Sequence, residues 1–304
     1  MAPYLSLRDQ LSLTISLPPL PEQRAIAGVL GALDDKIALN RRMNATLEAM
    51  ARALFRDWFV DFGPTRAKEA GQPPYLAAAL WSLFPARLDK SGIPEGWKEK
   101  PLVEFFEIIG GGTPKTSNAE FWDGDIPWFS VKDTPPAGSV FVVDTEKAIT
   151  PAGLEGSSAH LVPKGTTIIS ARGTVGNLAI AGREITFNQS CYGLRGRGSV
   201  GDFTTYLVAQ NMVRHLQAMA HGSVFSTITR KTFESVSLVM PDAKVLGEFE
   251  SRLEPMFCKI LANINESRTL TGLRDLLLPR LMSGEVRVRD AETEILDQPS
   301  SEIT

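Results

Sequence analysis

Several segments of the sequence place hydroxyl, amide and cationic side chains beside glycines or at the ends of apolar runs. They are Thr113, Lys115, Ser117 and Asn118, then Arg172 and Thr174, then Arg195 and Arg197, and finally Ser226, Thr227, Thr229, Arg230 and Lys231. Arg, Lys and Asn side chains hydrogen-bond base edges, whereas phosphates accept hydrogen bonds from Lys, Arg, hydroxyl and backbone N–H groups. These residues are therefore the candidate DNA-binding set, and the stretch 226–231 is its best candidate for direct contact.

Each part of this set also has a structural interpretation. Arg172 lies beside a glycine in an expected turn, so a scaffolding role or a phosphate contact is an alternative to base readout. The segment 115–118 is equally consistent with a solvated loop. The two arginines in 195–197 have Glu184 and Asp202 as alternative surface partners.

The sequence shows no catalytic constellation. The segment 110–115 resembles a phosphate-binding loop only in its glycines, because the GxxxxGK[ST] spacing is missing and Pro114 has no N–H to donate. The three histidines, His160, His215 and His221, have neither metal-ligand spacing nor an obvious acidic partner, so structural or surface roles are expected. We therefore expect no metal and no cofactor in this chain.

The composition is that of a globular protein without bulk positive charge. The chain has 43% hydrophobic and 22% charged residues and a formal net charge of -3, which argues against coating nucleic acid through overall charge. No stretch approaches the roughly 20 apolar residues of a membrane span, and the N-terminus lacks the pattern of a targeting leader. Cys191 and Cys258 are too few for a disulfide framework, so a cytoplasmic location is expected.

A unit of strand, proline and long helix occurs twice in the chain. Pro18 corresponds to Pro241, and at the same offset Lys36 and Ile37 correspond to Lys259 and Ile260. The alternating strand before Pro18 likewise matches the one before Pro241. An internal repeat of this kind indicates two copies of one structural unit.

Both predicted helices carry a coiled-coil seam with steps of four and three residues. The first seam is Ile26, Leu30, Leu33, Ile37, Asn40, Asn44, Leu47, Ala51, Leu54 and Trp58, and the second is Phe249, Leu253, Met256, Ile260, Asn263, Ser267, Leu270, Arg274, Leu277 and Leu281. The polar interruptions match, since Asn40 corresponds to Asn263 and Asn44 to Ser267, and such residues fix register. The helices, each of about 40 residues and roughly 60 Å long, are therefore expected to pack on each other rather than serve as unrelated amphipathic helices.

Four aromatic residues, Phe55, Trp58, Phe59 and Phe62, gather at the end of the first helix. They are expected to close the core where this helix meets the rest of the chain, to dock a partner protein, or to do both. Between the two helices the pattern changes to short strands with turn residues, which predicts an α+β domain. The predicted boundaries are 1–17 for strands, of which 5–17 match 228–240, 18–62 for the first helix, 63–95 for a linker, 96–240 for the β-rich domain, 241–289 for the second helix and 290–304 for an acidic tail.

Ordered motifs along residues 5–289 carry a family resemblance. They are Leu-Pro-Pro-Leu-Pro-Glu-Gln-Arg-Ala-Ile-Ala at 17–27, Leu-Asp-Asp-Lys-Ile at 33–37, Trp97, Gly-Gly-Thr-Pro at 111–114, Ile-Pro-Trp at 126–128, Ser-Ala-Arg-Gly-Thr-Val-Gly at 170–176 and Leu-Leu-Pro-Arg-Leu-Met-Ser-Gly-Glu at 277–285. With these motifs the sequence resembles the specificity subunit of type I restriction-modification enzymes.

The resemblance implies a fold and a set of partners. Members of that family normally hold two target-recognition domains, each followed by a long helix, and the helices pair antiparallel as a spacer. Each domain reads one half of a bipartite site in double-stranded DNA. A modification subunit supplies S-adenosylmethionine and methylates adenine, and a restriction subunit supplies ATP-driven translocation and cleavage with Mg. The specificity subunit itself is not catalytic, and the expected fold here is a β-rich recognition domain carried by an antiparallel coiled coil.

The sequence departs from this pattern at its start. It begins at the last strands of a first recognition domain, which implies one complete domain and a remnant of another, and a homodimer would then read a symmetric site. One alternative is a truncated subunit that assembles with its partners but lacks bipartite recognition. Another is a stand-alone methyltransferase, because 72–75 resembles the Asp/Asn-Pro-Pro-Tyr loop of amino-methyltransferases. Against this, its first residue is Gln72 and no glycine-rich cofactor loop precedes it.

Overall fold

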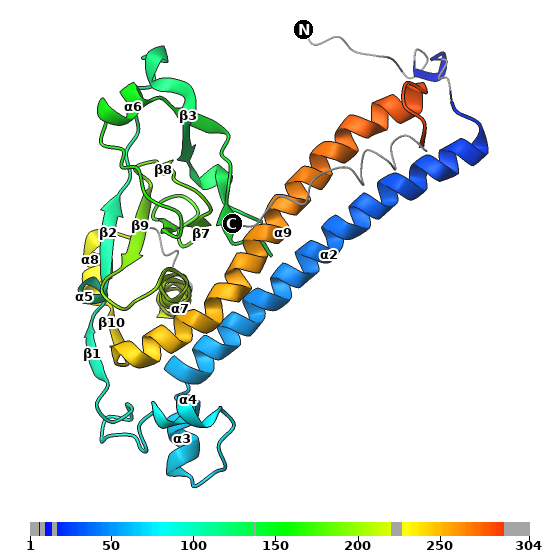
Figure 1. The fold of residues 1–304 in the computed structure, drawn as a ribbon. Coiled ribbons are helices and arrows are strands. Elements are labelled where there is room, and N and C mark those ends of the chain that lie inside the picture. Colours follow the sequence, from blue (N-terminus) through cyan, green and yellow to red (C-terminus); the bar gives the residue numbers. More distant parts are fainter. Residues whose placement is uncertain (1–5, 7–9, 14–16, 137, 220–226, 289–304) are drawn as a thin grey trace. The chain divides into compact units, whose positions relative to one another are not determined.

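A computed structural model describes residues 6, 10–13, 17–136, 138–219 and 227–288. The chain divides into two compact units, one formed by 1–41 with 263–304 and the other by 42–262. Two long helices, α2 (Leu20–Phe59) and α9 (Ala243–Ser283), contribute to both units, so each unit contains one half of the helix pair (Figure 1). Within the described part of the chain, none of the helices has the length and apolarity that a membrane crossing requires.

In the first unit the two helix halves pack antiparallel along the predicted seam. Ile26 and Leu33 of α2 form a buried cluster with Leu277 and Leu281 of α9. At the edge of this seam, Arg274 Nη1 lies 2.8 Å from Asp34 Oδ1, and nearer the other end of the unit Lys36 Nζ lies 3.2 Å from Glu266 Oε2. Residues early in α2 contact residues late in α9, and later residues of α2 contact earlier residues of α9. This confirms the predicted antiparallel pair.

The polar interruptions of the seam lie inside it. Asn40 and Asn263 are fully buried, and Asn44 is 3% exposed. The side-chain amide of Asn40 donates to Glu266 Oε2 at 2.8 Å, to Ser267 Oγ at 3.3 Å and to the backbone carbonyl of Asn263 at 3.5 Å. Because these acceptors lie at one level of α9, a shift of either helix by one turn would leave the buried amide without them.

In the second unit the remaining helix halves are held together by aromatic side chains. The ring centroid of Trp58 lies 5.4 Å from that of Phe249, and the guanidinium of Arg252 lies 5.8 Å from the Trp58 ring. Phe55 also faces Phe249, with ring centroids 6.2 Å apart. The end of α2 therefore meets the beginning of α9, in agreement with the antiparallel direction of the pair.

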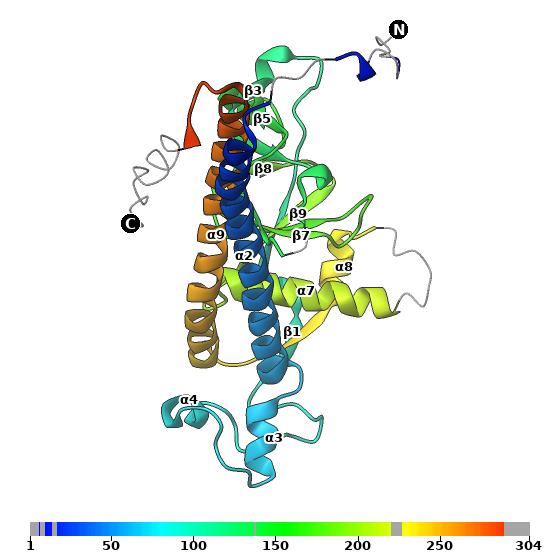
Figure 2. The same cartoon turned by 90° about the vertical axis from the view of Figure 1, so that its right-hand side faces the viewer.

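The domain between the helices is built on a five-stranded sheet with the strand order β2-β9-β6-β7-β4. The strands are β2 (Phe106–Gly110), β4 (Phe141–Val142), β6 (Thr167–Ser170), β7 (Leu178–Ala181) and β9 (Cys191–Gly196). All neighbours are antiparallel except β4 and β7. Helix α7 (Asp202–Met219) lies beside this sheet and contacts β6, β7 and β9 (Figure 2). The predicted α+β class is therefore confirmed.

Two smaller sheets complete the domain. β3 (Trp122–Phe129) pairs antiparallel with β5 (Lys147–Ile149) and parallel with β8 (Thr186–Phe187), whereas β1 (Lys98–Pro101) pairs with β10 (Ser237–Met240). The short helices are α5 (Leu102–Phe105), α6 (Pro151–Glu155), α8 (Arg230–Ser235), η1 (Ala119–Phe121) and η2 (Val131–Asp133). A core that includes Phe129, Ile168 and Phe187 joins the five-stranded and three-stranded sheets.

The segment 63–95 is more ordered than the predicted linker. It contains α3 (Gly63–Glu69) and α4 (Ala78–Ser82). After the break at 60–62 that follows α2, Gly63 and Pro64 begin α3, because proline is tolerated in a first helical turn. The break from α2 is made by Phe62, which adopts a left-handed backbone with φ of 52°. A side chain at Gly63 would collide with Asp57, whose carboxylate accepts from Tyr75 Oη at 3.0 Å.

The predicted strands in 1–17 are not found among the residues described there, which are 6, 10–13 and 17. Gln10 and Leu11 are helical instead, and the backbone N–H of Gln10 donates to the carbonyl of Ser6. The matching strand β10 has its backbone hydrogen bonds satisfied by β1.

Candidate nucleic-acid interface

Four loop segments are held together by backbone hydrogen bonds at one end of the strands β2, β6 and β9. The N–H of Ala171 donates to the carbonyl of Ser190 at 2.7 Å, and the N–H of Ile228 donates to the carbonyl of Ala171 at 2.9 Å. The N–H of Gly112 donates to the carbonyl of Phe187 at 2.9 Å. We call the segments 111–113, 171–177, 188–190 and 227–231 the loop surface.

The glycines of the first segment allow close packing inside the protein. A Cβ atom on Gly111 would lie 2.0 Å from the carbonyl oxygen of Asn188, and one on Gly112 would lie 2.2 Å from the nitrogen of Ala159. The indole of Trp128 donates to the carbonyl of Gly112 at 2.9 Å. Gly111 and Gly112 are therefore held by close backbone contacts inside the domain. Because these glycines have no side chains, the segment passes between the backbone at Asn188 and the backbone at Ala159. This close packing sets the position of the next residue, Thr113.

The second segment forms a compact turn that exposes its polar side chains. The backbone N–H of Asn177 donates to Ser170 Oγ at 2.9 Å, and Ser170 Oγ in turn donates to the carbonyl of Thr174. Gly173 adopts a φ of 78°, which favours glycine. Arg172 and Thr174 are exposed. The segment thus forms a hydrogen-bonded turn, and the side chains of Arg172 and Thr174 face solvent from it.

The fourth segment leads into α8. Thr229 forms a capping box with Thr232: the Thr229 side chain accepts from the backbone N–H of Thr232, and the N–H of Thr229 donates to Thr232 Oγ1 at 3.1 Å. The Thr229 side chain therefore has a structural role at the helix start. Arg230 and Lys231 are exposed in the first turn of α8, whereas Thr227 is partly buried. Ser226 lies outside the described residues.

The segment that follows Thr113 is exposed but partly committed to structure. The side chain of Asn118 accepts from the N–H of Glu120 at 3.2 Å and so caps η1. The carbonyl of Lys115 accepts from the indole of Trp122 at 3.4 Å. The side chains of Lys115 and Ser117 face solvent two and four residues beyond the loop surface.

Arg195 and Arg197 are not brought to the loop surface. The loops meet β9 at Cys191, whereas Arg195 lies about 13 Å along the strand and Arg197, just past its end, about 20 Å, at about 3.3 Å per residue. Burial raises the pKa of Asp202, and the positive charge of Arg195 acts in the opposite direction. Among the described residues, neither arginine forms a salt bridge with Glu184 or Asp202. Arg195 and Arg197 lie away from the loop surface, and their assignment to the candidate DNA-binding set stays a prediction.

The loop surface carries cations without carboxylate partners. In the described ranges, Arg172, Arg230 and Lys231 form no salt bridge. Some other exposed cations of the same unit have partners, such as Arg87, whose Nε lies 3.1 Å from Glu95 Oε2, whereas others, such as Lys98 and Arg197, form no salt bridge among the described residues either. Unpaired cations on a rigid loop scaffold give a local positive potential, despite the overall charge of -3.

One polar residue of the loop surface is absent from the candidate set predicted from the sequence. Gln189 is exposed in the turn after β8, and its amide oxygen accepts a hydrogen bond from the hydroxyl of Thr113. The two residues come from different segments. The only signal in the sequence is an amide residue in the polar triplet Asn188-Gln189-Ser190 after the apolar run 185–187.

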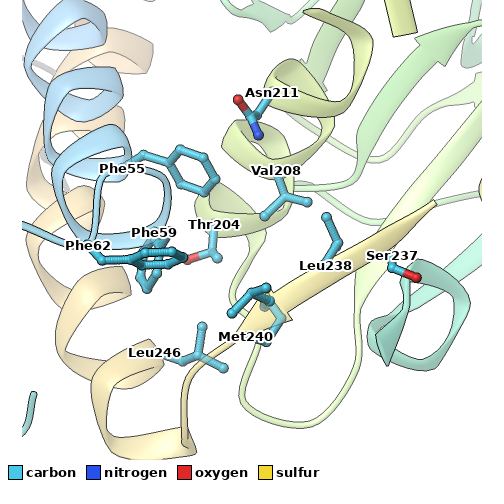
Figure 3. A pocket seen from close by; sticks show the side chains of 11 residues that line it. Phe55, Phe59, Phe62, Thr204, Val208, Asn211, Ser237, Leu238, Met240 and Leu246 are labelled. Carbon is cyan, nitrogen blue, oxygen red and sulfur yellow. The ribbon is translucent and has the colours of Figure 1, made fainter. Parts of the chain in front are cut away.

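The four aromatic residues at the end of α2 serve mainly the packing of this unit. Trp58 is fully buried, so its ring has no surface left for another subunit, and its predicted partner-docking role is corrected to a packing role. Phe55, Phe59 and Phe62 line a pocket of about 160 Å³ with residues of α7 and β10 (Figure 3). The Phe62 ring also packs on Trp97, with centroids 5.8 Å apart.

The titratable residues of the described ranges do not meet the requirements of a metal site. No group of three or more His, Cys, Asp or Glu residues could hold a metal ion there. Burial raises the pKa of Cys191 to about 12, so its thiol stays protonated at neutral pH. Tyr75, in the segment that resembles a methyltransferase loop, donates its hydroxyl to Asp57 and packs on Trp81.

Comparison with known proteins assigns this arrangement to a family. A profile of the type I restriction modification DNA specificity domain matches residues 94–257, which include the three sheets, α7 and the loop surface. The chain therefore belongs to the type I restriction-modification DNA specificity family. Its members supply the DNA specificity of type I restriction-modification systems.

Individual relatives agree with this assignment. The chain is 28% identical to the HindI specificity subunit of Haemophilus influenzae, over 93% of this chain and 71% of the relative. It is 30% identical to the MjaIX specificity subunit of Methanocaldococcus jannaschii, over 59% of this chain and 44% of the relative. The crystal structure of a type I S subunit from M. genitalium matches with a TM-score of 0.55 at 16% identity, over 86% of this chain and 61% of that one. The chain thus spans less than two thirds of the length of some of these relatives, and the last comparison supports the fold.

Proposed function

We propose that this chain is a DNA-reading subunit whose loop surface binds double-stranded DNA. The observation that carries the proposal is the set of exposed cations Arg172, Arg230 and Lys231, which form no salt bridge within the described ranges, on a domain that matches the specificity family. Phosphates would accept hydrogen bonds from these side chains and fix the position of the duplex. Hydroxyl and amide groups of the same loops would then face base edges.

We further propose that the chain is not itself catalytic and acts with protein partners in the cytoplasm. The long helices would dock a modification subunit that carries S-adenosylmethionine and flips a target adenine into its own pocket. A restriction subunit with ATP and Mg would join through that complex. Exposed leucines on the helices support the docking proposal: in the first unit Leu39 is 45%, Leu276 49% and Leu278 46% exposed. Isolated apolar side chains are common on surfaces, but several on one helix pair favour an interface.

Salt-dependent DNA binding tests this proposal. The complex of this chain with its modification subunit is titrated with a fluorescent duplex at several salt concentrations. Each phosphate contact contributes about 0.9 to the slope of log K against log salt, so Arg172→Ala, Arg230→Ala and Lys231→Ala should each lower the slope by up to about one. Arg197→Ala, at the other end of β9, is the matched control and should leave it unchanged. Equal slopes for all four variants would contradict the proposed interface.

A further inference from the structure

Gln189 stands at the tip of a tight turn in the loop surface. The N–H of Asn188 donates to the carbonyl of Phe129 at 2.9 Å, and its side-chain oxygen accepts from the N–H of Ser190 at 3.0 Å. The N–H of Cys191 then donates back to the carbonyl of Asn188 at 3.1 Å. These bonds fix the backbone on both sides of Gln189, while its side chain is exposed.

Thr113 fixes the direction of the Gln189 amide. Its own position is set because Gly111 and Gly112 pass too close to neighbouring backbone for any side chain. The Thr113 hydroxyl donates to Oε1 of Gln189. Since the oxygen and nitrogen of a primary amide diverge from one trigonal carbon, the bond from Thr113 to the oxygen leaves the amide nitrogen on the other branch with two N–H groups to donate.

The surroundings of Gln189 are those of a DNA contact. The carbonyl of Ser190 accepts from Ala171, so the turn that exposes Arg172 is directly adjacent, and Ala171 is bonded in turn to Ile228 at the entry to α8. The oriented amide therefore lies among the cations that would hold phosphates. An oriented donor beside phosphate-binding groups is the arrangement that direct readout requires.

We propose that Gln189 is a specificity-determining residue that donates its amide hydrogen to a base edge in the major groove, and that Thr113 is its positioning residue. The inference rests on the proposed DNA-binding function. Guanine, adenine and thymine each present an acceptor in the major groove, whereas cytosine presents only a donor, its N4 amino group. The base opposite Gln189 is therefore not cytosine.

The test compares the sequences that variants recognise. Complexes of the chain with its modification subunit and S-adenosylmethionine are incubated with a random duplex library, and the methylated sites are sequenced. Gln189→Glu replaces a donor with an acceptor, so one position of the motif should shift toward a base with an amino group, cytosine above all. Gln189→Ala should lose about 10-fold of discrimination at that same position. Gln72→Glu makes the same chemical change on an exposed side chain between α3 and α4 and should leave the motif unchanged.

Variants of Thr113 separate positioning from general stability. Thr113→Val removes the hydroxyl and should weaken discrimination at the position that Gln189 controls, whereas Thr113→Ser keeps the hydroxyl and should restore it. Gln189 variants that keep the wild-type motif, or that weaken binding to all sequences equally, would overturn the inference while leaving the proposed function intact. A wild-type complex that selects no sequence would contradict the proposed function and this inference together.

Discussion

The carboxylate of Glu250 on α9 caps the first turn of α7 through Thr204. Glu250 Oε2 accepts from the backbone N–H of Thr204 at 2.9 Å and from its hydroxyl at 2.6 Å, and Oε1 accepts from the N–H of Phe203 at 2.9 Å. Because α7 contacts β6, β7 and β9, this carboxylate links the beginning of α9 to the sheet that carries the loop surface.

Removal of this cap should destabilise the second unit. Glu250→Ala leaves three donors of a helix N-terminus without an acceptor, and we expect a loss of about 1–2 kcal/mol in the free energy of unfolding. Urea unfolding followed by circular dichroism measures it. Glu254→Ala, an exposed carboxylate on the same helix, should cost less than about 0.5 kcal/mol. An equal cost for both variants would show that the cap contributes nothing specific.

The buried Tyr206 should make stability decline at alkaline pH. Its hydroxyl lies 3.4 Å from Glu48 Oε1, and burial followed by the charge of Glu48 raises its pKa above the usual value of about 10. Below about pH 10, Tyr206 is protonated in the folded and the unfolded chain, and its contribution to the free energy of unfolding is fully present. Above it the unfolded chain loses the proton first, so the free energy of unfolding falls by up to about 1.4 kcal/mol per pH unit.

Urea unfolding of the wild type and Tyr206→Phe at pH 8, 10 and 11 tests this dependence. The variant lacks the hydrogen bond and should be less stable by about 1 kcal/mol at pH 8. The difference between the two proteins should shrink between pH 10 and 11. Two curves that stay parallel over this range would refute the assignment.

The consecutive glycines 110–112 provide a matched pair of substitutions. A Cβ atom on Gly112 would lie 2.2 Å from backbone atoms of Ser158 and Ala159, whereas one on Gly110 would meet no atom within 4 Å. Gly112→Ala should therefore cost more than about 2 kcal/mol of unfolding free energy, and Gly110→Ala less than about 0.5 kcal/mol. Thermal melting ranks the two variants. Equal melting temperatures would mean that the segment 111–113 is not held against its neighbours.

The two cysteines should react with thiol reagents at very different rates. Cys191 is buried with its pKa raised to about 12, whereas Cys258 is exposed on α9. The native chain at pH 8 should therefore release one equivalent of thionitrobenzoate from Ellman's reagent, and two after denaturation. Cys258→Ser should abolish the native reaction. Two fast thiols in the native chain would show that the strand behind the loop surface is open to solvent.

Crosslinking tests whether the helix pair forms within one chain. Asp34 and Arg274 form a salt bridge across the seam at 2.8 Å and are partly exposed. With Cys258→Ser as background, Asp34→Cys and Arg274→Cys in one chain should be joined by a short bismaleimide into a crosslinked monomer. Crosslinked dimers as the main product would instead indicate helices paired between two copies.

The periodic parts of the fold were predictable because burial follows the sequence pattern directly. Ile26, Leu33, Leu277 and Leu281 are buried at their predicted seam positions, since the 3–4 spacing leaves one face for packing. β9 was not predicted, because Gly193 and Gly196 weaken any strand pattern. Gly193 is required there by the Phe187 ring, which a Cβ would approach to 2.9 Å.

The candidate site was predictable only in part, for a topological reason. Residue types identified Arg172 and Arg230, but no local pattern shows that Cys191 lies at the loop end of β9 and Arg197 at the other. Gln189 was missed because its significance depends on Thr113, which lies 76 residues away in the sequence. Such pairs arise from strand order, which a single sequence does not specify.

The mapping of methylated sites tests the central claim most directly. The chain is co-expressed with its modification subunit, and the complex is incubated with S-adenosylmethionine and a random duplex library. We expect methylated adenines within one defined motif, and the loss of that motif in the triple variant Arg172→Glu, Arg230→Glu, Lys231→Glu while the complex still assembles. A split motif with inverted identical halves would mean that two copies of the chain act together. A single short motif would mean that one recognition domain suffices. A stable complex that methylates no defined site, or a triple variant that retains the wild-type motif, would contradict the claim that the loop surface reads DNA.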